Sequence, residues 1–158
     1  MMNPFVANLL LALIWLVITG GFSLGNLLFG FFLGAGSLFL IREQIGAQGY
    51  FQRGRKVLGL ILFLIYDLAV SAWRVANVVL APKLDVRPGV FLYRHRVKTD
   101  FEIALLSNLV GLTPGTLIFD ISEDNSTLFV HALDCSDPEA RRREIADGFE
   151  RRILEAFR

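Results

Sequence analysis

Charge is absent from the first quarter of this chain. Residues 1–41 contain no charged side chain, although the whole sequence has 16 Lys and Arg and 15 Asp and Glu residues. Since 54% of the chain is also hydrophobic, these facts exclude an ordinary water-soluble domain and indicate membrane helices at the N-terminal end. The opening Met1-Met2-Asn3 lacks the positive charge that begins a signal peptide, so no cleavable signal is expected.

Cysteine and histidine are scarce, which removes several kinds of chemistry. The single Cys135 excludes an internal disulfide bond, and no neighbouring base would activate it as a catalytic thiol. His95 and His131 have no second ligand at metal-binding spacing, so we expect no metal and no cofactor. No nucleophile and base recur at usable spacing, and no basic, aromatic-rich face is present. The sequence therefore predicts neither an enzyme nor a nucleic-acid partner.

Three apolar runs occupy residues 1–82, and we expect them to form transmembrane helices at about 5–19, 24–41 and 57–81. The first two are short and are separated by paired glycines, which leaves open whether their hairpin fully crosses the bilayer. In the second run Gly30, Gly34 and Ser37 recur at helical spacing. Such a stripe of small residues favours the close approach of another helix.

The third run is long enough to cross a membrane but carries four polar side chains, Asp67, Ser71, Arg74 and Asn77. The favourable insertion of its aliphatic residues exceeds the cost of one carboxylate near the midplane by a small margin, so the helix should need a protein neighbour. Asp67, Ser71 and Arg74 share one helix face. Because Asp67 and Arg74 are about 10.5 Å apart along the axis, each is expected to have another partner. The residues leave open whether Asp67 relays ions or protons or serves assembly.

The C-terminal half, residues 84–158, mixes basic and acidic side chains in the way that is typical of a solvated domain. Its pattern predicts a strand at 90–97, a helix from the cap Thr99 to Leu112, strands at 116–122 and 127–134, and a helix that begins after Asp137. The fold class expected is thus α+β, in the order β-α-β-β-α, with helices on one face of one sheet. Basic residues flank the third run on both sides, and their slight excess after Pro82 favours a cytoplasmic C-terminal half.

Four segments carry a resemblance to a known family. The stretch Leu105–Thr116, LLSNLVGLTPGT, is similar to the family pattern LxNLxTLTPGT, and Leu128–Asp134, LFVHALD, is similar to its strand L-Y-V-H-x-L-D. The opening NLLLALIW at 8–15 and the third run, with its carboxylate and its VLAP ending, fit as well. The chain resembles the E subunits of the Mrp-type (Mnh/Pha) multisubunit cation/proton antiporters, with Asp67 in place of a usual Glu and Gly111 in place of a usual Thr.

The resemblance implies a non-catalytic accessory or assembly subunit of a Na+(K+)/H+ antiporter in the bacterial cell membrane, which contributes to cation efflux and pH homeostasis. Its implied partners are other membrane subunits, the lipid bilayer, and the Na+ or K+ and protons that the complex handles. The resemblance also places the C-terminal domain in the cytoplasm. The residues that it marks, as a turn and strand for docking, are Asn108, Thr113, Pro114, Gly115, Thr116, His131 and Asp134.

One alternative of a different class stays open at this point. The chain would be a stand-alone, membrane-anchored module whose C-terminal domain binds a soluble ligand or protein. That hypothesis predicts an open, polar pocket of ligand size in residues 84–158, and a chain that is stable as a monomer or homodimer.

Overall fold

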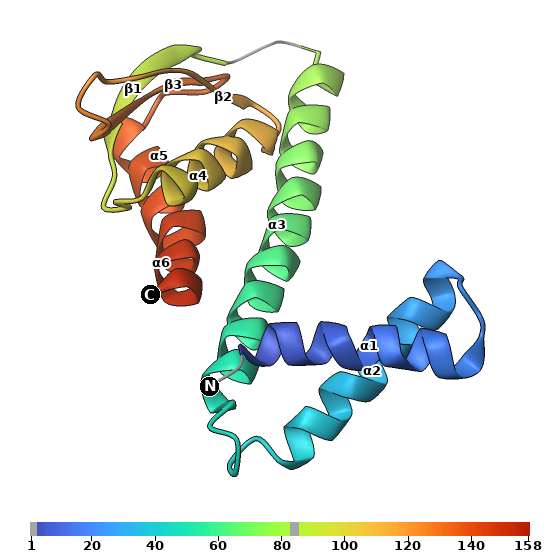
Figure 1. The fold of residues 1–158 in the computed structure, drawn as a ribbon. Helices are drawn as coiled ribbons and strands as arrows, with labels where there is room; N and C mark the ends of the chain where they lie inside the picture. The colour runs from blue at the N-terminus through green and yellow to red at the C-terminus, as the bar shows by residue number, and fades with distance from the viewer. Residues whose placement is uncertain (1–2, 83–85) are drawn as a thin grey trace. The chain divides into compact units, whose positions relative to one another are not determined.

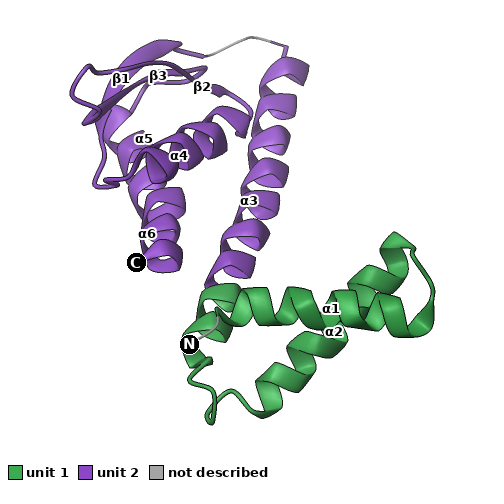
Figure 2. Ribbon diagram, viewed as in Figure 1, with its two compact units in different colours: residues 1–55 green, residues 56–158 purple. Residues whose placement is uncertain are grey.

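The computed structural model describes residues 3–82 and 86–158, and it divides the chain into two compact units, residues 1–55 and 56–158 (Figure 2). The boundary expected between residues 82 and 84 lies at the edge of residues 83–85, outside the described residues. The third apolar helix clusters, from Lys56 onward, with the C-terminal half of the chain. The coarse prediction of a helical, apolar part followed by a small domain with one sheet is confirmed.

The first unit is built around a hairpin of two apolar helices, α1 (Pro4–Thr19) and α2 (Leu24–Leu40) (Figure 1). Both helices begin as their sequences indicate, because the side chains of Asn3 and Ser23 accept hydrogen bonds from backbone N–H groups of the first turns. Across the hairpin the indole Nε1 of Trp15 donates to Oδ1 of Asn26 at 2.9 Å. This bond satisfies two polar groups within an otherwise apolar pair of helices.

Two glycines of the small-residue stripe lie where α1 meets α2. A Cβ atom added at Gly30 would lie 2.9 Å from Cδ1 of Trp15, and one at Gly34 would lie 2.5 Å from Oδ1 of Asn8. Both glycines are buried, whereas Ser37 is exposed and its hydroxyl donates to a carbonyl of its own helix. The close approach of the two helices therefore depends on Gly30 and Gly34 and does not involve Ser37.

Replacing Gly34 with Leu should destabilise the hairpin, because the new side chain would have to displace Asn8 and part of α1. We expect a loss of about 1–3 kcal/mol, the usual cost of overpacking a tight contact, seen as a lower melting temperature of the purified chain in detergent. Gly36→Leu is the matched control, since nothing lies within 4 Å of a Cβ at that position. Equal melting temperatures for the two variants would contradict the contact.

The long helix α3 (Gln48–Leu80) starts nine residues before the predicted residue 57 (57 − 48 = 9). The prediction stopped at the change from polar to apolar residues, but Gln, Arg and Lys are good helix formers and the backbone hydrogen bonds continue through them. Among the described residues, α3 is the one helix that is both long and apolar enough to cross a membrane. Its length and its apolar composition are the two properties that permit a crossing.

The C-terminal domain has one antiparallel sheet, in the strand order β1-β3-β2. Its strands are β1 (Gly89–Arg94), β2 (Thr116–Ile121) and β3 (Thr127–Ala132). The predicted order of elements is confirmed, although the first strand ends at Arg94 and not at residue 97. The register with β3 ends at Arg94, opposite Thr127, and only one further backbone bond follows, from the N–H of His95 to the carbonyl of Ser126 at 3.2 Å.

Helices cover one face of this sheet: α4 (Asp100–Leu112), α5 (Pro138–Ile145), the π-helical turn η1 (Ala146–Glu150) and α6 (Arg151–Phe157) (Figure 1). The core that they enclose contains Phe91, Tyr93, Leu106, Leu128, Val130 and Ile153, all at most 4% exposed. The opposite face of the sheet exposes Val90, Leu92, Leu117 and Phe119. The single last helix that the sequence predicts is interrupted by η1.

Both predicted helix starts in this domain are present. Thr99 and Glu102 form a capping box, and Asp137 caps α5 with Pro138 in its first turn. The backbone N–H groups of Lys98 and Thr99 donate to the Glu102 carboxylate. These bonds, that of Lys98 first, hold the pKa of Glu102 below its ordinary value, because they favour the charged form.

A buried carboxylate ties the end of β1 to η1. Glu150 is 1% exposed and accepts hydrogen bonds from the Tyr93 hydroxyl at 2.8 Å, from the backbone N–H of Arg96, and from Nε of Arg96 at 3.2 Å. Burial, followed by the hydrogen bond to Glu150, raises the pKa of Tyr93 above its ordinary value. An ionised Tyr93 is therefore incompatible with this arrangement.

The raised pKa of Tyr93 predicts a loss of stability at high pH. Its contribution is fully present below the unfolded-state pKa of about 10, and it falls by about 1.4 kcal/mol for each pH unit above that value. Tyr93→Phe should be less stable at pH 9, where a hydrogen bond is lost, but should lose less on going to pH 11. Denaturant unfolding of the chain in detergent, followed by circular dichroism, measures both differences. An equal pH-dependent loss in the two proteins would contradict the assignment.

Candidate functional site

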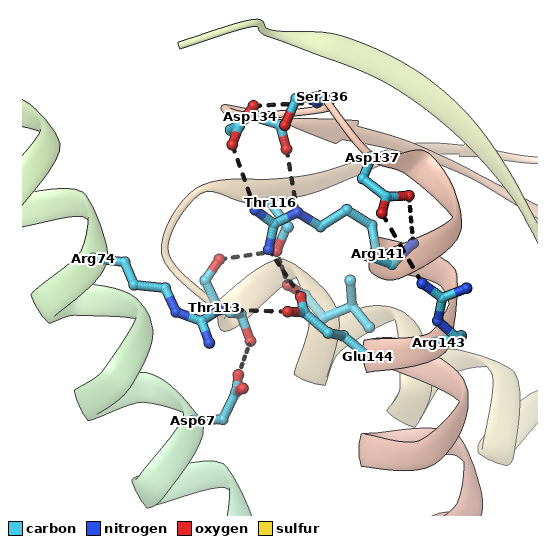
Figure 3. A network of polar contacts seen from close by, with 12 residues as sticks. Asp67, Arg74, Thr113, Thr116, Asp134, Ser136, Asp137, Arg141, Arg143 and Glu144 are labelled. Atoms are coloured by element: carbon cyan, nitrogen blue, oxygen red, sulfur yellow. Dashed lines mark hydrogen bonds and ion pairs between the residues drawn. The ribbon is translucent and has the colours of Figure 1, made fainter. Parts of the chain in front are cut away.

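Figure 3 shows a network of polar contacts between the second half of α3 and the C-terminal domain. On α3, Oδ2 of Asp67 accepts a hydrogen bond from the hydroxyl of Thr113, at 2.8 Å. One helical turn before Asp67, the ring of Phe63 packs edge-on against Phe149 with 5.1 Å between ring centroids. Leu60, almost one turn earlier, is buried in the core of the domain. The polar side chain near the middle of this apolar helix thus has its partner within the same chain.

Opposite charges alternate beyond Asp67. Arg74 lies 3.5 Å from the Glu144 carboxylate, Arg141 lies 2.9 Å from the same carboxylate, and Arg141 also lies 3.8 Å from Asp134 (Figure 3). Two guanidinium groups therefore face two carboxylates, and the row has no net charge. Because Arg74 and Glu144 are 57% and 52% exposed, this pair contributes at most about 1 kcal/mol. The ion pair between Arg74 and Glu144 therefore adds little to stability.

Asp134 holds the loop between β3 and α5 in place. The backbone N–H of Ser136 donates to its carboxylate at 3.1 Å. Hydrogen bonds from Ser136, with a smaller effect of the nearby Arg141 guanidinium, lower the pKa of Asp134 from its ordinary value. Asp134 therefore stays ionised well into the acid range, and Arg141 keeps its charged neighbour.

The turn between α4 and β2 has the geometry that Pro114 and Gly115 predict. The backbone N–H of Thr116 donates to the carbonyl of Thr113 at 3.2 Å, and Gly115 has a φ of +91°. A side chain there would be strained, and its Cβ would meet a methyl group of Val75 at 3.4 Å. The turn is therefore built for close contact with α3.

A cavity of about 400 Å³ lies beside this turn. Eight residues that the sequence singled out line it: Ser71, Arg74, Asn77, Thr113, Pro114, Gly115, Thr116 and Asp134. Asp67 lines a smaller neighbouring cavity, of about 50 Å³. Residues from the third apolar run and from the TPGT motif, which the sequence kept as two separate groups, therefore form one site.

Two of the motif residues lie elsewhere. Asn108 is exposed on α4, where its side-chain amide donates to the carbonyl of Ala104 at 2.8 Å. His131 is exposed on the open face of the sheet, in register with Val90 and Leu117. Gly30, Gly34 and Ser37 belong to the first unit and have no part in this site.

The sequence analysis missed the residues on the domain side of the site, Arg141, Glu144 and Phe149. They lie in the helical segment that the sequence predicts after Asp137, and nothing in the sequence distinguishes a carboxylate bound to α3 from one in water. The sequence signal for this contact is Gly148, a glycine inside a helical segment, which is buried in the structure. A Cβ there would lie 3.1 Å from the ring of Phe63, so the glycine admits the aromatic ring.

The chemistry available to this site is limited. Within residues 3–82 and 86–158, no group of three or more His, Cys, Asp or Glu side chains is placed to hold a metal ion. The polar groups described above pair with one another. The contacts around this network pack α3 against the C-terminal domain.

Comparison with known proteins identifies the family. A model described as "Na+/H+ ion antiporter subunit" matches residues 8–156, and the chain belongs to this family. It is 37% identical over 150 residues to the E1 subunit of the Na(+)/H(+) antiporter of Staphylococcus haemolyticus, covering 95% of this chain and 94% of that one. It is 36% identical over 151 residues to the E subunit of the Na(+)/H(+) antiporter of Bacillus subtilis, covering 96% of each. The resemblance stated from the motifs is confirmed.

Two solved structures share the fold. A chain in the structure of the Mrp complex from Dietzia sp. DQ12-45-1b is 24% identical with a TM-score of 0.51, covering 65% of this chain and 96% of that chain. A chain of the membrane-bound sulfane sulfur reductase, described as an archaeal respiratory membrane complex, is 22% identical with a TM-score of 0.59. In that case 99% of this chain and all of that chain are covered.

Removing the Asp67 carboxylate should destabilise the contact between α3 and the domain. Asp67→Leu leaves the Thr113 hydroxyl with only the Leu109 carbonyl, 3.2 Å away, and we expect a loss of about 1–2 kcal/mol. Asp67→Asn should lose less, since its amide oxygen still accepts the bond. Asn77→Leu on the same helix is the control, because Asn77 is exposed. Denaturant unfolding in detergent gives the order, and a loss for Asn77→Leu as large as for Asp67→Leu would contradict it.

Proposed function

We propose that this chain is a non-catalytic accessory subunit of a multisubunit Na+/H+ antiporter in the bacterial cell membrane, and that it serves assembly. The observation that carries the proposal is the family match over residues 8–156, which includes both the apolar helices and the C-terminal domain. Relatives with this whole-length similarity are named as subunits of Na(+)/H(+) antiporters. Through the complex, the chain would contribute to cation efflux and pH homeostasis.

The distribution of polar and apolar groups supports an assembly role. The charged residues in the second half of α3 have their partners inside the chain, in the network around Asp67 and Glu144. What remains exposed on the hairpin of α1 and α2 is large and apolar, with Ile18, Phe22, Leu24, Phe32 and Leu40 each at least 71% exposed. Surfaces of this kind are stable only against lipid or another apolar protein surface.

The same network bears on the role of Asp67. A carboxylate that relays protons or Na+ needs a path to exchange its ligand, whereas Asp67 is bound to a hydroxyl of its own chain at 2.8 Å. We therefore favour a structural role for Asp67, with ion and proton transfer carried by other subunits. For the C-terminal domain we propose the cytoplasmic side, on the basis of the basic residues that follow Pro82.

A ligand-binding module is the weaker candidate, although the cavity beside the TPGT turn has the size of a small-molecule site. The two guanidinium groups that line it already pair with carboxylates, Arg74 with Glu144 and Arg141 with Asp134 and Glu144. A ligand would have to replace these pairs to be recognised. The whole-length family match adds nothing in favour of a stand-alone module.

Mild-detergent extraction of the tagged chain at native expression tests the proposal. We expect a particle that contains several polytopic membrane proteins, and vesicles that carry it should show Na+-dependent collapse of a proton gradient. Asp67→Asn should leave the exchange rate per complex within about twofold, because the amide retains the bond that holds α3. Asp67→Leu should reduce the amount of complex.

Two results would contradict this proposal. If the extracted chain is a lone monomer or homodimer, it is not a subunit of a larger complex, and the ligand-binding function becomes the better explanation. Loss of exchange in Asp67→Asn at normal complex levels would instead put Asp67 on the ion or proton path. The amount of complex, measured on the same vesicles, separates the two.

A further inference from the structure

Residues 57–80 of α3 have one side against the C-terminal domain. Leu60 and Ser71 are 5% and 6% exposed on this side, and the guanidinium of Arg152 lies 3.7 Å above the ring of Phe63. The contact continues to Arg74, so it covers about 21 Å of helix. Both charged residues between 57 and 80, Asp67 and Arg74, lie on this side.

Between residues 57 and 80, the opposite side of α3 carries no charge. Its exposed large residues recur at helical spacing, and we call them the uncharged stripe: Leu58, Ile61, Leu62, Ile65, Tyr66, Trp73, Val79 and Leu80, from 47% to 81% exposed. The stripe is about 33 Å long. Tyr66 and Trp73 lie toward one edge of it, where a ring can rest in lipid while its polar atom reaches the headgroups.

A helix with the C-terminal domain packed along one side cannot readily cross the bilayer. If residues 57–80 spanned the hydrocarbon, the segments that contact them would enter it as well. Those segments carry the ion pair between Arg74 and Glu144, together with Arg141 and Arg152, and hydrocarbon offers such groups neither water nor headgroups. A bilayer can instead accept a helix along its surface, with an apolar side in the lipid and a polar side facing out.

We propose that α3 lies along the membrane–water interface with the uncharged stripe in lipid and its polar side against the C-terminal domain. Both ends of the segment 57–80 then lie on the same side of the membrane as the domain. The inference differs from the crossing at 57–81 that the sequence alone predicts. It rests on the proposed function only in requiring a membrane, whatever the complex does there.

Topology is measured with single-cysteine variants of the full chain, in a Cys135→Ser background. Lys56→Cys and Ala81→Cys place thiols at the two ends, both exposed, and Ser136→Cys marks the side of the domain. An impermeant maleimide is applied to right-side-out and to inverted membrane vesicles. All three thiols should react in the same vesicle orientation. Reaction of Lys56→Cys and Ala81→Cys in opposite orientations would show a crossing helix and overturn the inference, while leaving the proposed function intact.

The lipid contact is measured by fluorescence quenching. The chain has two tryptophans, so Trp15→Phe leaves Trp73 as the sole indole. In vesicles of phosphatidylcholine and phosphatidylglycerol, brominated lipids should quench Trp73 most strongly when the bromine is near the headgroup. A matched variant with Asn77→Trp and Trp73→Phe, at the margin of the stripe, should be quenched less. Trp73 that no brominated lipid quenches would show a stripe covered by protein, and would overturn the lipid assignment even if the thiols lie on one side.

Discussion

The hydrogen bond between Asp67 and Thr113 ties the apolar helix α3 to the C-terminal domain, and the contacts around it serve the same end. It joins the most polar point of an apolar helix to the turn that ends α4, and the residues around it fit this contact. Gly115 brings the turn close to Val75, and Gly148 makes room for Phe63. A carboxylate in an apolar environment is costly unless it is hydrogen-bonded, so the α3 helix and the domain that follows it stabilise each other's least favourable parts.

The two charged residues in the apolar part of α3, Asp67 and Arg74, have their partners within the same chain. Asp67 and Arg74 are too far apart to pair with each other, and the sequence by itself suggests a helix that needs partners in other subunits. The C-terminal domain supplies both partners, through Thr113 on one side and Glu144 on the other. The apolar surfaces that the chain offers to its surroundings are the outer sides of α1 and α2, the uncharged stripe of α3 and the open face of the sheet. Membership of a family of antiporter subunits agrees with such a surface.

Much of the local structure could be predicted from the sequence, because its signals are short-range. The capping box at Thr99, the Pro-Gly turn after Thr113 and the cap at Asp137 each act within four residues, and all three are present. The site could be predicted only in halves. The TPGT turn and the polar residues of α3 were singled out separately, and their contact spans 46 residues of sequence. Gly148, inside the π-helical turn, marks a close contact, but its partner, the ring of Phe63, comes from a distant part of the chain.

The separation of these partners along the chain has a consequence for biosynthesis. A chain is made from its N-terminus, so α3 is complete before Thr113 exists, and Glu144 follows Arg74 by seventy residues (144 − 74 = 70). During that interval α3 is an apolar helix with an unpaired carboxylate, available to the insertion machinery or to chaperones. The strand order adds to the delay, because β1 obtains its neighbour when β3 has been made. The order of synthesis therefore exposes α3 first and shields it last, so the choice between insertion and docking falls to the relative speed of translation and folding.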